Sequence, residues 1–117
     1  MRRANPLAST NLALKFALEL AALALFGYWG AVVGDGLYAV VLGVAAPVLM
    51  IAVWGTFAAP RAARRLPAPA RIPLELGVFA AACAAGFAAS AAVAATVFGV
   101  LVVLNAIGLT AYGQWSS

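Results

Sequence analysis

Four long apolar segments constrain the fold of this chain more than any other feature of its sequence. We expect membrane spans at residues 15–33, 37–59, 72–89 and 93–112. A helix needs about 20 residues to cross a hydrocarbon core of roughly 30 Å, and each segment has about that length. Helices are expected because each backbone polar group is then bonded within its own segment. The sequence therefore predicts an all-α fold, a polytopic membrane four-helix bundle.

The composition leaves no room for a soluble domain beside these spans. The chain has 117 residues, of which 67% are hydrophobic and only 9% are charged, whereas soluble domains have roughly 25% charged residues. It has no histidine and one cysteine, Cys83, so an intramolecular disulfide is excluded and zinc, haem or copper ligation is not expected. A nucleophile paired with a histidine base is excluded as well. We expect one transmembrane domain over residues 1–117, with no cofactor and no enzymatic activity.

The basic residues all fall on one side of the predicted membrane, and the opposite loops carry only Asp35. These bases are Arg2, Arg3, Lys15, Arg61, Arg64, Arg65 and Arg71. The positive-inside rule then places both termini and the basic loop at residues 60–71 in the cytoplasm. Because the bases adjoin apolar spans, we expect their partner to be the lipid bilayer, including anionic headgroups, and not nucleic acid.

Two carboxylates lie inside the apolar spans, Glu19 in the first and Glu75 in the third. A charge within hydrocarbon is costly, and such a residue is a candidate functional site. Each glutamate follows a base by four residues, Lys15 before Glu19 and Arg71 before Glu75, so each pair shares a helical face. The pairs either lock the helices together as ion pairs or line a cytoplasm-facing cavity that binds a cation or exchanges protons.

An offset of 56 residues superimposes the two halves of the sequence. The superimposed pairs are Glu19 with Glu75, Lys15 with Arg71, Gly30 with Gly86, and Gly43 with Gly99. We therefore predict two helical hairpins that form a parallel repeat, related by a pseudo-axis along the membrane normal. Inverted repeats suit alternating access more naturally, which weighs against a transporter. The alternative is that two alanine-rich halves align by chance.

The end of the second span holds a further group of candidate residues. Trp54 and Arg61 lie where this span meets the cytoplasm. They either anchor the helix at the interface or wall the same pocket as the glutamates. Pro60 is expected to end the helix because it has no N–H to donate.

Three residues within the spans are expected to shape the packing. Pro47 in the second span predicts a kink, which either opens a cavity or fits a neighbouring helix. Asn105 in the fourth span either bridges two helices or contacts a ligand, and Gly86 belongs to a small-residue pattern that permits close helix packing. That packing serves either the bundle itself or a homo-oligomer. Trp115 lies near a predicted membrane border and is typical of interface aromatics.

Several of these stretches together carry a resemblance to a known family. They are the leucine-flanked glutamates at residues 18–20 and 74–76, Ala46-Pro47, and the string WGTFAAPR at residues 54–61. With them the chain resembles the YrdB family, small four-helix membrane proteins catalogued as a domain of unknown function. The resemblance covers nearly the whole chain and implies a multi-pass protein of the bacterial inner membrane. It implies no activity.

Two classes of function are compatible with the sequence. The first is a small transporter or a protein that binds a cation or small molecule, with a glutamate-containing site on the cytoplasmic side. The second is a structural or accessory subunit that packs laterally against a larger membrane complex or binds anionic lipid. The candidate polar site comprises Glu19, Glu75, Lys15, Arg71, Trp54, Arg61 and Asn105.

Overall fold

The computed structural model describes residues 6–59, 62 and 64–115, and its regular structure in these ranges is helical. The elements are α1 (Pro6–Val33), α2 (Leu37–Val53), the π-helical turn η1 (Trp54–Ala58), α3 (Ala68–Ala88) and α4 (Ala92–Ala111). The turn η1 continues α2 without a break, so the described residues form four long helical segments. All four are long and apolar enough to cross a membrane. The expected all-α, four-helix architecture is confirmed.

Two helices begin earlier than the spans expected from hydropathy. α1 starts at Pro6, so Lys15 lies well inside the helix. α3 starts at Ala68 and carries a proline in its first turn. Proline is tolerated there because the N–H groups of the first turn form no hydrogen bond within the helix. Arg71 therefore belongs to α3 and not to the loop at 60–71.

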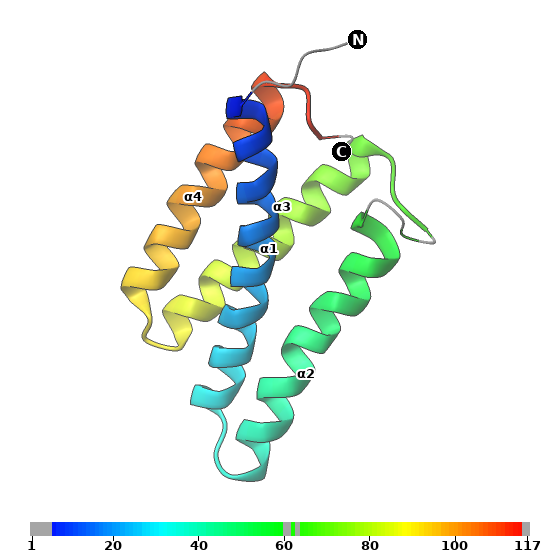
Figure 1. Cartoon of the computed structure of the whole chain (residues 1–117). Helices are drawn as coiled ribbons and strands as arrows, with labels where there is room; N and C mark the ends of the chain where they lie inside the picture. Colours follow the sequence, from blue (N-terminus) through cyan, green and yellow to red (C-terminus); the bar gives the residue numbers. More distant parts are fainter. Residues whose placement is uncertain (1–5, 60–61, 63, 116–117) are drawn as a thin grey trace.

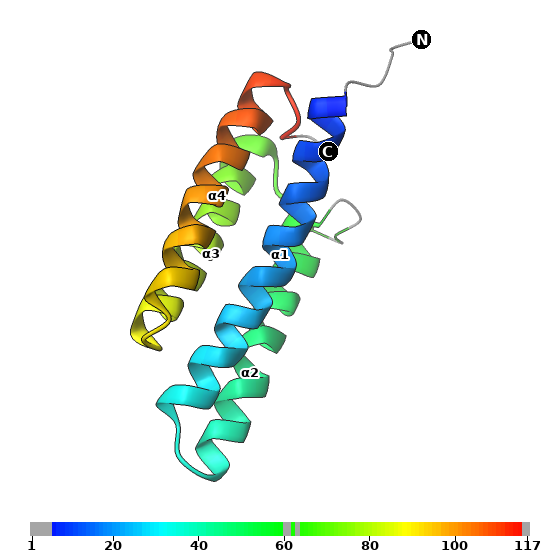
Figure 2. The same cartoon turned by 60° about the vertical axis from the view of Figure 1, so that its left-hand side comes forward.

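α1 is the central helix of the bundle. It packs against α2 on one side and against the α3–α4 hairpin on the other (Figures 1 and 2). α2 packs mainly on α1 and approaches α3 through η1. Between α2 and α3 lies an apolar groove of about 540 Å³, lined in part by Phe26, Leu49 and Val78. The N- and C-terminal ends of the described chain lie at the same end of the bundle (Figure 1).

A cluster of buried apolar residues lies at the centre of the bundle, and three aromatic rings join the helices there. The ring of Phe79 lies 5.6 Å from that of Trp54 and 6.0 Å from that of Phe98, measured between centroids. Tilted and edge-on ring pairs of this kind are favourable. α2 itself adds only Met50 to the buried residues. The core therefore lies among α1, α3, α4 and η1.

Glycines set the closest approaches between helices. A Cβ atom on Gly30 would overlap the backbone of Leu42, so α1 and α2 meet backbone to backbone. A Cβ atom on Gly86 would lie 2.9 Å from the Ala95 side chain of α4. Gly86 thus has the close-packing role expected from its small-residue pattern. Pro47 lies inside α2, close to Gly27 of α1, which agrees with a proline that fits a neighbouring helix.

We expect Gly30→Ala to destabilise the protein. The added methyl group meets backbone atoms, which cannot rotate away, so α1 and α2 must move apart at a cost of about 1–3 kcal/mol. Thermal unfolding in detergent measures the effect as a lower Tm. Gly77→Ala is the matched control, because nothing lies within 4 Å of the Cβ it would add. Equal Tm values for the two variants would contradict the close approach at Gly30.

Candidate functional site

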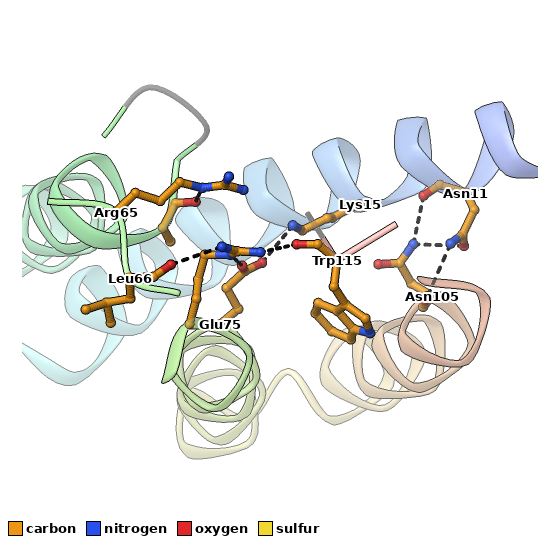
Figure 3. Close-up of polar contacts among 9 residues, drawn as sticks. Asn11, Lys15, Arg65, Leu66, Glu75, Asn105 and Trp115 are labelled. Carbon is orange, nitrogen blue, oxygen red and sulfur yellow. Dashed lines mark hydrogen bonds and ion pairs between the residues drawn. The ribbon is translucent and has the colours of Figure 1, made fainter. Parts of the chain in front are cut away.

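The centre of the candidate site is a carboxylate with no solvent exposure. Glu75 of α3 is 0% exposed and lies between two cations (Figure 3). Arg71, one turn earlier on α3, donates from Nε to Glu75 Oε2 at 3.1 Å, and Lys15 Nζ of α1 lies 2.7 Å from Glu75 Oε1. Both cations are themselves buried. We call Lys15, Arg71 and Glu75 the buried ion triad, and it joins α1 to α3.

Lys15 has a different partner from the one that the sequence suggests. The i, i+4 spacing favours a pair between Lys15 and Glu19, but the ammonium reaches across to Glu75 instead. The difference in burial explains this choice. A fully desolvated carboxylate is strongly destabilised unless opposite charges lie next to it, whereas Glu19 is only half-buried. The expected pair of Arg71 with Glu75 is present.

The guanidinium of Arg71 also holds two stretches of chain outside α3. Nη1 donates to the Leu66 carbonyl at 3.0 Å, and Nη2 donates to the Trp115 carbonyl. Three of its donor nitrogens are therefore used by three different elements: α3, the preceding loop and the C-terminal segment. This use of a planar, multidentate cation is one that lysine cannot reproduce.

A second polar layer lies beside the triad and bridges α1 to α4. Asn105 is buried, and its Nδ2 donates to both the carbonyl and Oδ1 of Asn11, at 2.8 and 2.9 Å. Asn11 Nδ2 in turn donates to Gln114 Oε1 at 3.0 Å. Of the two roles open to Asn105 in the sequence, the structure therefore supports the helix bridge.

Glu19 faces a cavity of about 350 Å³ between α1 and η1. The lining residues are Leu12, Lys15, Phe16, Glu19, Trp54, Ala58 and Ala59. Among the residues that the structure describes, none forms a hydrogen bond or ion pair with the Glu19 carboxylate. The two glutamates therefore differ in their surroundings: Glu75 is buried within the triad, while Glu19 lines a cavity.

The π-helical turn η1 contributes Trp54 and Ala58 to the lining of this cavity. Ala59 N–H donates to the Trp54 carbonyl at 2.8 Å, five residues back, which is the π-helical pattern and is frequent at functional sites. One side of the Trp54 ring packs on Phe79, and the residue also lines the Glu19 cavity. Trp54 is thus more than an interface anchor. Pro60 and Arg61 lie outside the described residues.

Sequence reasoning missed the polar partners at the chain ends. Asn11 lies four residues before Lys15 and eight before Glu19, so the three form one polar stripe along α1. That spacing was a usable signal. No comparable sequence signal pointed to Gln114 and Trp115, because their contacts depend on how the chain turns after α4. Trp115 was expected at the membrane interface, and nothing in the sequence indicated that its ring also lies near Lys15.

No metal-ligand cluster is present in the described part of the chain. There, no three histidine, cysteine, aspartate or glutamate side chains come together as metal ligands. The Cys83 thiol donates to the Ala95 carbonyl at 3.3 Å, between α3 and α4 and away from the glutamates.

Comparison with known proteins gives a family but no activity. The model of a family described as "Protein of unknown function (DUF2568)" matches residues 13–103. A Bacillus subtilis protein, "Uncharacterized protein YrdB", is 32% identical over 105 residues, which cover 84% of this chain and 85% of the relative. No solved structure matches. The resemblance drawn from the glutamate and tryptophan motifs is confirmed.

We expect Glu75→Gln to lower stability far more than Glu19→Gln. The first change leaves two buried cations without a counter-charge, which costs about 3–5 kcal/mol for a broken buried pair. The second removes a charge that no described side chain pairs with, at little cost. Thermal unfolding of both purified variants in the same detergent tests this, and each serves as the control for the other. Similar losses in Tm would mean that both glutamates are structural.

Proposed function

This chain belongs to the DUF2568 family of proteins of unknown function, and we propose that it is a multi-pass membrane protein that binds a small organic cation at Glu19. The observation that carries the proposal is that Glu19 lines a cavity and forms no hydrogen bond or ion pair with a described residue. An ionisable group placed in this way within an apolar helix favours a functional role over a structural one.

The charge and shape of the cavity favour a cation with an apolar body. Lys15 also lines the cavity, but its ammonium lies 2.7 Å from Glu75 Oε1, so its charge is offset there. The remaining lining residues are apolar, and they include Trp54, which η1 contributes. A carboxylate and an aromatic ring are the two groups that attract organic ammonium ions in proteins. A volume of about 350 Å³ lies within the range of small-molecule sites.

The distribution of bases supports a site that opens toward the cytoplasm. Arg71 lies in the first turn of α3 and Lys15 in the first half of α1, and both helices begin at the end of the bundle that carries both chain termini (Figure 1). The positive-inside rule puts that end in the cytoplasm. With four apolar helices this gives an inner-membrane protein whose site is reached from the cytoplasmic leaflet. Carrying the cation across the membrane is the natural extension of such a site.

Close contacts within the hairpins support a duplicated origin. In the first hairpin, a Cβ atom on Gly43 would lie 3.5 Å from the Gly27 carbonyl; in the second, one on Gly99 would lie 3.2 Å from Cys83 Sγ. An offset of 56 residues relates Gly43 to Gly99 and also Gly27 to Cys83. The same offset relates Glu19 to Glu75. A duplication therefore explains how one carboxylate took the structural role and left the other available for a ligand.

The groove between α2 and α3 supports a second candidate, an accessory subunit. α4 packs along α1, whereas α2 is separated from α3 by the apolar groove of about 540 Å³. A helix of a larger membrane complex would fill that space, and so would lipid. This role needs no unpaired glutamate, so the two candidates differ in what they require of Glu19.

We expect the purified protein to bind benzyltrimethylammonium, and Glu19→Gln to weaken that binding by about tenfold or more, or about 1.4 kcal/mol. The change removes the counter-charge and keeps the shape of the side chain. Isothermal titration calorimetry in detergent measures the affinity, and intrinsic tryptophan fluorescence gives a second readout. Asp35→Asn is the matched control, because it removes one acidic charge in the turn between α1 and α2. Equal affinity in wild type and Glu19→Gln would rule out this site.

A further inference from the structure

The chain beyond α4 turns back over the bundle. Gly113 has a φ of +63°, a left-handed conformation that glycine adopts without strain. Gln114 N–H then donates to the Leu109 carbonyl at 2.8 Å. The C-terminal segment, residues 112–115, consequently lies beside the start of α1 and the start of α3 (Figures 1 and 3).

Side chains from three helices hold this segment in place. Gln114 is buried, donates from Nε2 to the Ala8 carbonyl at 2.8 Å and accepts from Asn11. The Trp115 carbonyl accepts from Arg71, and its indole N–H donates to Thr110 Oγ1 at 3.0 Å. A segment tied to α1, α3 and α4 closes one side of the buried ion triad.

Lys15 is the residue through which the C-terminal segment reaches the Glu19 cavity. Its Nζ lies 6.0 Å from the centre of the Trp115 ring and 2.7 Å from Glu75 Oε1. Lys15 also lines the cavity, whereas Trp115 does not. An effect of the segment on a ligand in the cavity therefore passes through this lysine.

We propose that residues 112–115 form a lid that holds Lys15 on Glu75 and so keeps Glu19 available to a cation. Glu19 lies one turn from Lys15, within reach of the same ammonium. When the lid is in place, the Trp115 ring and Glu75 retain the lysine. When the lid lifts, the ammonium moves to Glu19 and displaces the bound cation. Lys15 is then a positioning residue, and lid closure and cation binding favour each other.

This inference rests on the proposed function, and a double-mutant cycle tests the link. Gly113→Val places a β-branched residue where φ is positive and opens the lid, while Gly113→Asn tolerates that conformation and is the matched control. We expect Gly113→Val to weaken benzyltrimethylammonium binding about fivefold or more and Gly113→Asn to leave it unchanged. In a Lys15→Met background, where no ammonium competes, Gly113→Val should have no effect. Equal weakening in both backgrounds would overturn the proposal.

Hydrogen exchange over residues 112–115 reports on the lid without a ligand. We expect faster exchange in Gly113→Val, and also in Trp115→Leu, which keeps the carbonyl but removes the ring near Lys15. Lys15→Met should speed exchange in the same way, and a saturating cation should slow it in wild type. Unchanged exchange in both Trp115→Leu and Lys15→Met would overturn the lid, even if Glu19 binds the cation. Absence of cation binding to wild type would overturn the proposed function. The hydrogen-exchange data would still test whether residues 112–115 form a lid held by Lys15.

Discussion

The fully buried carboxylate of Glu75 is the constraint on which the rest of the structure depends. Removing a charge from water costs several kcal/mol, and only close opposite charges and hydrogen bonds offset that cost. Arg71 supplies one of these from the same helix, and Lys15 supplies the other from α1. This need fixes the depth and rotation of α1 against α3. Arg71 also donates to the Leu66 and Trp115 carbonyls. One side chain therefore positions both the loop before α3 and the C-terminal segment.

The two halves of the chain use the same motif in different ways. Glu19 and Glu75 occupy matching positions under the 56-residue offset, yet Glu75 forms ion pairs with both Lys15 and Arg71, and Glu19 forms an ion pair with neither. The two hairpins also pack differently. The second helix of the second hairpin, α4, packs along α1, whereas the second helix of the first hairpin, α2, is separated from α3. A cavity remains on the side where the packing is looser, and the π-helical turn η1 forms its wall.

The sequence predicted the four helices well, because long apolar runs leave few other folds in a membrane. It also predicted the Arg71–Glu75 pair, since that pair is local to one helix. It did not predict the partner of Lys15, because the choice between Glu19 and Glu75 depends on which carboxylate tertiary packing buries. The contacts of Trp115 were not predictable either, since they follow from the turn at Gly113. Local spacing identifies residues able to pair, but burial decides which of them do.

The balance of charge limits how tightly the proposed site at Glu19 holds a cation. Lys15 and Arg71 balance Glu19 and Glu75 in formal charge, and Arg65, which donates to the carbonyl of the cavity residue Ala58, adds a further positive charge. A bound monovalent cation leaves the cluster with a net positive charge in surroundings of low dielectric, where like charges repel strongly. Under the proposed function, binding is therefore favourable only while Lys15 stays against Glu75, and we expect its affinity to be modest. A modest affinity suits the release of a ligand, which is compatible with the proposed extension of the site to transport.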